Sequence, residues 1–212
     1  MEVNGFAKIV YQFSEWVTRL LCVNLLWIAF TLLGFVFFGF FPATIAMFAV
    51  VRKWVIKEKD FQVFHLFWKT YKAEFVKMNG LGFFFIVAGF FLYLDMRFFP
   101  FKDGWIYIVL LVSLLGILFL YFIMVGFFFP IYVHYDFTYI QSIKYSLMIG
   151  LAAPFQSILL LVVSYFIFII SVSNPILILL FSGSSTSFLW FWISFHILLN
   201  LEKRRLKQAE GY

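Results

Sequence analysis

The chain has 212 residues, of which 65% are hydrophobic, 25% are aromatic and only 12% are charged. A water-soluble domain of this composition would expose far more apolar surface than water tolerates, whereas a lipid bilayer solvates such surface. The formal net charge of +6 comes from basic residues that crowd between apolar stretches, which is typical of membrane topology rather than of nucleic-acid binding. We therefore predict one integral membrane domain over residues 1–212.

The spacing of apolar residues in 1–19 predicts a helix that lies at the membrane surface. These apolar residues recur at spacings of three and four, and the polar residues fall on the other side of the same helix. Glu2 precedes any basic residue, and no short apolar core leads into a cleavage site, so we expect no signal peptide. Cys22 is the single cysteine, which excludes an intrachain disulfide and a CxxC pair.

The apolar stretches that follow predict five transmembrane helices and two cytoplasmic amphipathic helices, which makes the expected fold all-α. No Asp, Glu, Lys or Arg occurs in the 57 residues between Lys144 and Glu202. Pro42 is expected to end the first span and Pro130 the third, because proline lacks the amide donor of a helix interior. The expected spans are 20–41, 80–98, 105–129, 155–181 and 188–201, and the expected cytoplasmic segments are 43–79, 131–153 and 202–212.

The boundary between the fourth and fifth spans has two possible positions. In one, the fourth span continues through a kink at Asn174-Pro175, and the serine-rich residues 182–187 form a loop. In the other, the boundary lies at 171–175, because 188–201 alone is short for a bilayer. Both positions give five spans.

Charge selects the orientation of a five-span protein. Lys8, Arg19, Arg97 and Lys102 fall on one side of the membrane, and the other twelve Lys and Arg residues fall on the opposite side. Because positive charge accumulates in the cytoplasm, we expect the N-terminus outside the cell membrane and the C-terminus in the cytoplasm.

Six polar side chains are expected within the bilayer, where an unpaired polar group is costly, so each should face another helix. We predict hydrogen bonds between Asn24 and Asn174 and between Thr31 and His196. An ionisable residue inside a membrane can relay protons, but no carboxylate lies in the interior of a span as a partner for His196, because Asp95 lies near the end of its span, so a structural role is favoured. The six candidates are Asn24, Thr31, Ser164, Asn174, His196 and Asn200.

Two helix faces are expected to pack. Trp192, His196 and Asn200 share one face, which should point into the bundle. A stripe of small residues should let another helix approach closely. That stripe consists of Gly39, Ala43 and Ala46.

Six residues form a predicted basic cytoplasmic surface, which could attract anionic lipids or bind a partner protein, and lipid is the favoured reading. No HExxH, GxSxG or phosphate-binding glycine loop occurs, and His65 and His134 lack further ligands at metal-binding spacing. We therefore expect no enzyme activity, cofactor or metal. The six residues are Lys57, Lys59, His65, Lys69, Lys72 and Lys77.

Several motifs within residues 10–80 resemble the YesL-like family of bacterial membrane proteins, a domain of unknown function catalogued as family 624. They are Asn24-Leu25-Leu26-Trp27-Ile28, Gly39 with Pro42-Ala43-Thr44-Ile45-Ala46, Arg52-Lys53, and Phe67-Trp68-Lys69 with Phe75. The sequence departs from that pattern at Phe40-Phe41. The resemblance implies gene neighbourhoods with carbohydrate importers and glycoside hydrolases, and it assigns no catalytic residues.

Two functions follow as expectations. The first is a non-enzymatic accessory component of a carbohydrate uptake system, with the bilayer and importer subunits as partners. The alternative is a small stand-alone transporter or channel for a neutral solute, which would work by self-association. The Ser, Thr and Asn content of 155–201 supports this alternative.

Overall fold

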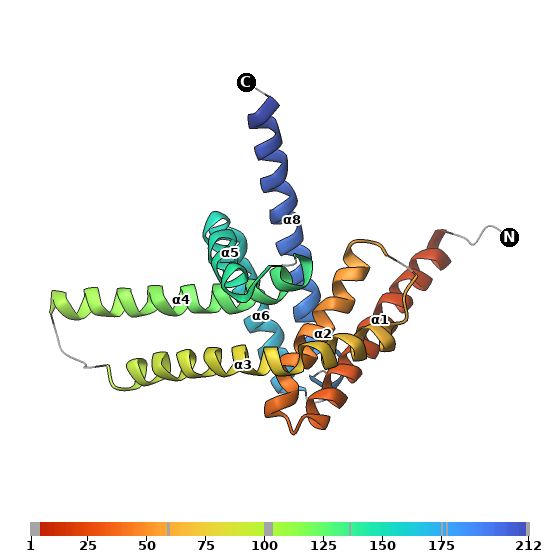
Figure 1. Ribbon diagram of the computed structural model, residues 1–212, viewed down its shortest axis with the longest axis horizontal. Coiled ribbons are helices and arrows are strands. Elements are labelled where there is room, and N and C mark those ends of the chain that lie inside the picture. Colours follow the sequence, from red (N-terminus) through yellow and green to blue (C-terminus); the bar gives the residue numbers. More distant parts are fainter. Residues whose placement is uncertain are drawn as a thin grey trace. The chain divides into compact units, whose positions relative to one another are not determined.

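The computed structural model describes residues 5–58, 60–99, 104–135, 137–174, 176 and 178–210. The regular structure of these residues is entirely helical, as expected (Figure 1). The helices are α1 (Gly5–Leu33), α2 (Phe37–Val55), α3 (Val63–Arg97), α4 (Trp105–His134), α5 (Tyr139–Ala152), α6 (Pro154–Ser173), the π-helix η1 (Ile178–Ser182) and α8 (Gly183–Glu210).

Five helices of the described residues are long and apolar enough to cross a membrane, so the chain is a multi-pass membrane protein. Their number is the expected one, but the set differs, because α1 and α2 both qualify and α8, which contains the expected span 188–201, does not. The five segments are Ala7–Leu33, Phe37–Val55, Val63–Arg97, Trp105–His134 and Pro154–Ser173.

The chain divides into two compact units, and each combines two separate stretches of sequence. Unit one consists of Met1–Phe75 and Val162–Leu189, and unit two consists of Val76–Leu161 and Trp190–Tyr212. The helices α3, α6 and α8 contribute residues to both units.

In unit one, α1 and α2 form an antiparallel hairpin, so the single span expected at 20–41 is wrong (Figure 1). The chain turns at 34–36, and α2 returns directly against α1. A Cβ atom on Gly39 would lie 2.3 Å from the carbonyl oxygen of Thr31, so only glycine fits there. Gly39, Ala43 and Ala46 are all buried, which confirms the stripe of close helix approach.

The two prolines do not end helices as expected. Pro42 lies inside α2 and Pro130 lies inside α4, and both helices continue for at least one further turn. A proline removes one backbone hydrogen bond, and transmembrane helices tolerate this loss where neighbouring groups compensate. The break in the first span therefore comes from the turn at 34–36 and not from Pro42.

Two amphipathic segments are continuous with their neighbouring apolar segments, and a third is separate. Residues 5–19 of the expected surface helix are the first part of α1, and the helix expected before 80–98 is the first part of α3. The amphipathic helix of the second connection is α5, which begins at a capping box formed by Thr138 and Gln141. It ends at Ala152, and Ala153 alone separates it from α6.

The first turns of α3 pack against α1 through aromatic rings. Phe67 and Tyr71 are buried, and their ring centroids lie 5.1 and 5.0 Å from that of Phe30. The Tyr71 hydroxyl also donates a hydrogen bond of 3.2 Å to the carbonyl oxygen of Phe30. The face of α3 that carries Phe67 and Tyr71 is therefore the face that packs on α1.

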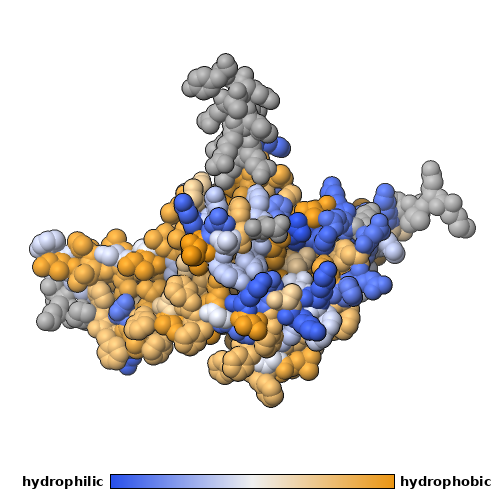
Figure 2. All heavy atoms as spheres, in the orientation of Figure 1, coloured by the Kyte–Doolittle hydropathy of each residue, from blue (hydrophilic) through white to orange (hydrophobic). Residues whose placement is uncertain are grey.

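Unit two is built around α4. A Cβ atom on Gly150 of α5 would lie 2.0 Å from Cγ2 of Ile123, so these helices touch at a glycine. The Tyr121 hydroxyl donates to the carbonyl oxygen of Phe85 in α3 at 2.9 Å. Much of the α3–α4 hairpin surface remains apolar and exposed (Figure 2). Its exposed residues include Phe83, Phe91, Trp105, Ile106 and Val112.

The serine-rich residues 182–187 are helical, so the loop expected there is wrong. The helix α6 ends at Ser173, η1 covers Ile178–Ser182 and α8 begins at Gly183. The break therefore agrees with the alternative boundary at 171–175. Three hydroxyls of this stretch donate to carbonyl oxygens three or four residues earlier in η1 and α8, which is compatible with a helical serine-rich segment in apolar surroundings.

Candidate functional site

Unit one contains a pocket of about 430 Å³ between α1, α2, α6 and the start of α8. Its volume is in the range of small-molecule sites in proteins. Aromatic and aliphatic side chains form most of its wall, including Trp27, Phe40, Met47, Phe48 and Phe168. Six hydroxyl side chains complete it, namely Thr44, Ser164, Ser171, Ser182, Thr186 and Ser187.

Asn24 fixes the end of the pocket where α8 begins. Its side-chain oxygen accepts a hydrogen bond of 3.0 Å from the backbone amide of Ser184, and both residues are fully buried. A Cβ atom on Gly183 would lie 3.0 Å from this same oxygen and 3.2 Å from Cε3 of Trp27. The start of α8 is thus held directly against α1.

Trp27 joins α1 to α2 at the pocket wall. Its indole Nε1 donates a hydrogen bond of 3.0 Å to the Thr44 hydroxyl, which in turn donates to the carbonyl oxygen of Phe40 at 2.7 Å. The Trp27 and Phe40 rings meet edge to face, with centroids 5.7 Å apart. The polar edge of the indole is therefore satisfied by the protein, and its apolar faces remain to form the wall.

The hydroxyls at the α8 side of the pocket are engaged in the same way. Thr186 donates to the Ser182 carbonyl oxygen at 2.8 Å, and Ser187 donates to that of Ser184 at 3.0 Å. Their oxygens keep acceptor capacity. Among the residues that the structure describes, no Asp, Glu, Lys, Arg or His lines the pocket. The arrangement suits an uncharged or apolar molecule and supplies neither an acid–base pair nor a counter-ion.

The polar residues expected in the spans differ in their burial and in their hydrogen-bond partners. Asn24 does face another helix, but the predicted bond to Asn174 is wrong, because Asn24 accepts from Ser184 and Asn174 is exposed beyond the end of α6. Ser164 lines the pocket. Thr31 is buried, and its hydroxyl has no hydrogen-bond partner among the described residues.

The polar face of α8 is exposed, so the expectation that it points into the bundle is wrong. Trp192, His196 and Asn200 lie on the open side, whereas Trp190 and Ile197 are buried. His196 Nδ1 donates to the Trp192 carbonyl oxygen at 2.8 Å. The bond expected between Thr31 and His196 would join the two units and stays a prediction, as does the choice between a structural role and a proton relay.

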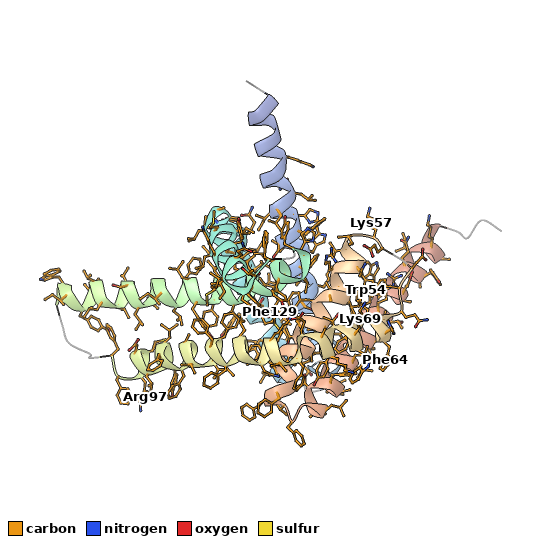
Figure 3. All side chains as sticks on the ribbon, in the orientation of Figure 1. Trp54, Lys57, Phe64, Lys69, Arg97 and Phe129 are labelled. Atoms are coloured by element: carbon orange, nitrogen blue, oxygen red, sulfur yellow. The ribbon has the colours of Figure 1, made fainter. Side chains whose placement is uncertain are left out.

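The predicted basic surface is exposed where the structure describes it (Figure 3). Lys57 follows α2, and the remaining described members lie on α3. Lys59 lies outside the described residues. Among those described, no three His, Cys, Asp or Glu side chains gather where they could hold a metal ion. The exposed members are Lys57, His65, Lys69, Lys72 and Lys77.

Sequence reasoning missed most of the pocket. Thr44 and residues 182–187 lie far apart in the sequence, and the serine-rich stretch indicates a loop by composition alone. Ser164 was the one predicted candidate that lines the pocket, and Asn24, a strongly polar side chain in an apolar stretch, indicated a contact with another helix beside it.

Comparison with known proteins places the chain among bacterial relatives. Residues 20–96 match the family described as "Protein of unknown function, DUF624". The chain is 32% identical over 203 residues to "Uncharacterized protein YteU" of Bacillus subtilis (strain 168), which covers 96% of this chain and 91% of that protein. It is 30% identical over 206 residues to "Uncharacterized protein YesL" of the same organism, with 97% of each covered.

A third relative, "Uncharacterized protein YesV" of Bacillus subtilis (strain 168), is 39% identical over 146 residues, which cover 68% of this chain and 70% of that protein. No solved structure matches the chain. Since the similarity to the first two relatives extends along nearly the whole sequence, the chain belongs to the DUF624 family of YesL-like proteins.

Proposed function

We propose that the protein is a non-enzymatic membrane component that acts as an accessory part of a bacterial carbohydrate uptake system. One observation supports the non-enzymatic part: the pocket holds hydroxyls and an indole, and none of the described residues that line it is acidic or basic. Ion-coupled carriers and hydrolases use such ionisable side chains. The uptake context rests on the resemblance to the YesL-like family, whose gene neighbourhoods include carbohydrate importers.

Exposed apolar surface supports a role in association. The α3–α4 hairpin leaves large side chains such as Phe83, Trp105 and Val112 uncovered within unit two. Lipid covers such a surface in part, and transmembrane partners bind through surfaces of the same kind. An importer subunit or a second copy of the chain fits this requirement.

Co-purification tests the proposal. The protein is cross-linked in native bacterial membranes, extracted in mild detergent and captured by a tag, and importer subunits are quantified by mass spectrometry. We expect a carbohydrate importer subunit to be enriched over an unrelated multi-pass protein of equal abundance. Importer subunits at background level would contradict the proposal.

Charge reversal on the basic surface tests whether this surface binds anionic lipid or the partner protein. Lys69→Glu with Lys72→Glu reverses two exposed charges on α3, and Lys144→Glu is the matched control on α5. If the basic surface contacts anionic lipid, the double variant keeps its partner and only its affinity for anionic vesicles falls. Loss of the partner in the double variant alone would identify this surface as the protein contact.

A second candidate function is transport of a neutral solute by the protein itself. The observation in its favour is the pocket of about 430 Å³ with six hydroxyl side chains on its wall. Hydroxyl oxygens with acceptor capacity and aromatic faces bind small uncharged molecules.

Flux into liposomes that contain only this protein tests transport. Ser171→Phe fills the pocket, whereas Ser173→Phe places the same ring at an exposed position of the same helix. Transport through the pocket predicts flux that Ser171→Phe abolishes and Ser173→Phe preserves. Absence of flux of any neutral solute above empty liposomes would reject this function.

For the orientation, we propose that both termini lie in the cytoplasm, with α8 as the crossing that follows α6 and was expected at 188–201, although α8 is less apolar than the five helices above. The α1–α2 hairpin brings both of its ends to the same side, so Lys8 and Arg19 join the basic residues that follow α2. Arg97 and Lys102 then remain outside, and the other fourteen of the sixteen Lys and Arg residues lie inside. This distribution is more biased than the expected twelve against four, so it replaces the outside N-terminus of that expectation.

A further inference from the structure

We propose that the α1–α2 hairpin is a wedge that enters the lipid from the cytoplasmic side and turns back without crossing the membrane. The partner of its tip is the hydrocarbon of lipid acyl chains. The inference rests on the orientation proposed above and goes beyond it, since a hairpin that crosses fully would also return both ends to the same side.

The uncharged arms of the hairpin are shorter than the hydrocarbon core of a bilayer. Residues 20–51 contain no charged side chain, and the turn divides them into arms of 14 residues (20–33) and 15 residues (37–51). At 1.5 Å per residue each arm reaches about 21–22 Å, whereas the hydrocarbon core of a bilayer is about 30 Å thick. As whole helices, α1 and α2 are long and apolar enough to cross a membrane. Their charge-free parts, bounded by Arg19 and Arg52, enter the core but do not span it.

The turn itself suits an environment without water. Phe35 and Val36 have φ values of 53° and 66°, which residues other than glycine rarely adopt. The backbone amides of the turn nevertheless find carbonyl partners within the hairpin: Val36 donates to Thr31 at 2.9 Å, and Phe38 donates to Gly34 at 3.1 Å. Hydrocarbon accepts an irregular segment only when its polar backbone groups are satisfied in this way.

The side chains of the tip are large, apolar and exposed. Phe35 is 83% exposed, Leu33 is 70% exposed and Phe38 is 60% exposed. In Figure 2 this tip appears as an apolar patch at the lower edge of the molecule. A concentration of exposed phenylalanine at one turn is not stable in water, and acyl chains cover it without a shape-matched protein partner.

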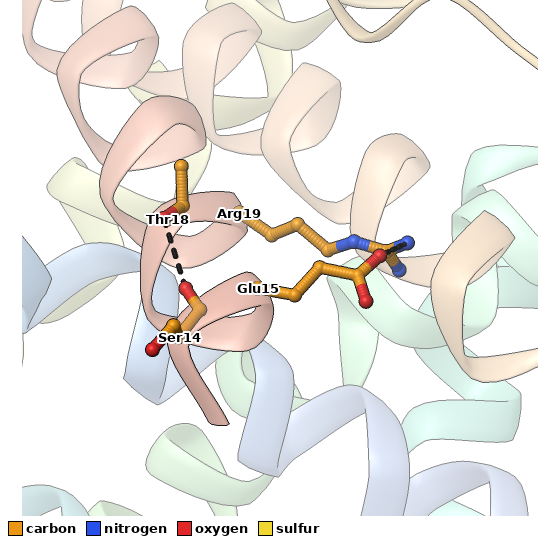
Figure 4. A network of polar contacts seen from close by, with 4 residues as sticks. All are labelled: Ser14, Glu15, Thr18 and Arg19. Atoms are coloured by element: carbon orange, nitrogen blue, oxygen red, sulfur yellow. Dashed lines mark hydrogen bonds and ion pairs between the residues drawn. The ribbon is translucent and has the colours of Figure 1, made fainter. Parts of the chain in front are cut away.

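The opposite end of the hairpin has the composition of a membrane–water interface. Trp16 and Trp54 lie there with ring centroids 6.3 Å apart, and Arg19 stacks over Trp16 at 5.5 Å. Arg19 also pairs with Glu15 at 2.5 Å (Figure 4). Tryptophan and basic residues mark the headgroup region, and Lys57 just after α2 extends the basic charge.

Site-directed labelling tests the wedge. The parent variant is Cys22→Ser, which removes the single cysteine. Single cysteines then replace Leu33 and Phe38 on the two arms of the tip, Lys57 at the base and Phe98 at the end of α3. An impermeant maleimide is applied to right-side-out and inside-out vesicles, and a fluorescent maleimide reports quenching by brominated acyl chains or by aqueous iodide.

We expect Leu33→Cys and Phe38→Cys to resist the impermeant reagent from both sides, and their fluorescence to be blue-shifted and quenched by brominated lipid. Lys57→Cys should react only from the cytoplasmic side and Phe98→Cys only from the outside. Two tip positions on different helices keep the test valid if one variant misfolds.

Two results would overturn the wedge. Reaction of both tip cysteines from the outside, as at Phe98→Cys, would show that the hairpin crosses. Iodide quenching without quenching by brominated lipid would place the tip in water or protein. Reaction of Lys57→Cys from the outside would instead reject the orientation, and the lipid quenching of the tip would still report separately on its depth.

Discussion

The side-chain oxygen of Asn24 accepts a hydrogen bond from the backbone amide of Ser184, 160 residues further along the chain. Ser184 lies where a π-helical turn passes into α8, and helix starts leave backbone amides without an intrahelical partner. An asparagine normally caps the helix that it precedes. Here the cap comes from a different helix, so the position of α8 in unit one depends on α1.

Removal of this cap should destabilise the protein. Asn24→Ala leaves a buried amide without its acceptor, and we expect a loss of about 1–2 kcal/mol in the free energy of unfolding. Unfolding of the detergent-solubilised protein measures the loss. Asn200→Ala, at an exposed position, is the control. An equal effect of the two substitutions would show that Ser184 does not depend on Asn24.

The bond between Trp27 and Thr44 should appear as a coupling energy. Trp27→Phe removes the indole donor and Thr44→Val removes the hydroxyl acceptor, while both keep most of the packing volume. Since the two groups share one hydrogen bond of 3.0 Å, the double variant should lose about 0.5–1.5 kcal/mol less than the sum of the single losses. Additive losses would mean that the bond contributes nothing in the membrane protein.

Gly39 should tolerate no side chain. Gly39→Ala places a methyl group 2.3 Å from the Thr31 carbonyl oxygen, which forces α1 and α2 apart and costs about 1–3 kcal/mol or more. Gly116→Ala is the matched control in α4, because no atom lies within 4 Å of its Cβ position. Thermal unfolding should separate the two variants, and a midpoint for Gly39→Ala equal to that of the control would contradict the close helix approach.

Gly126 should be coupled to the size of Trp190 in unit two. A Cβ atom on Gly126 would lie 2.1 Å from the Trp190 ring, so Gly126→Ala should destabilise by about 1–3 kcal/mol. Trp190→Leu removes the obstructing ring and should restore part of this loss when the two changes are combined. A double variant as unstable as the sum of both would indicate that the clash is relieved elsewhere.

The sequence was sufficient for the class of protein and for some contacts of the fold. Charge-free apolar stretches are diagnostic of a membrane protein. Gly39, Ala43 and Ala46 indicated close packing because small residues let backbones approach. Asn24 was expected to face another helix for an equally local reason, since a buried amide in apolar surroundings requires a partner. Each of these predictions depends on one segment and its surroundings.

The turn at 34–36 could not be predicted in this way. Pro42 is the stronger local signal for a break, yet α2 runs through it. The chain turns at Phe35 and Val36, two residue types that disfavour positive φ, because Gly34 and Gly39 allow the two helices to meet at the turn. That contact exists only after both helices have formed, so no local pattern reports it.

The pocket could not be predicted from local sequence patterns either. Ser171, Thr44 and residues 182–187 come from distant parts of the sequence, and serine-rich segments favour loops in water. In apolar surroundings the hydroxyls of Thr186 and Ser187 donate instead to backbone carbonyl oxygens of the preceding helical turn. A serine-rich composition that favours a loop in water is therefore compatible with a helix in apolar surroundings. Those surroundings exist only in the folded protein, so the local sequence does not report them.

The division of unit one between the two ends of the chain has a consequence for biosynthesis. Its first part ends at Phe75, and its second part begins at Val162. At about 5–20 residues per second, the ribosome needs several seconds or more to supply the missing segment. During this interval the start of α8, whose Ser184 amide donates to Asn24 in the complete unit, has not yet been synthesised. The early hairpin must therefore persist as an incomplete assembly, protected by lipid or by the insertion machinery, until the last quarter of the protein arrives.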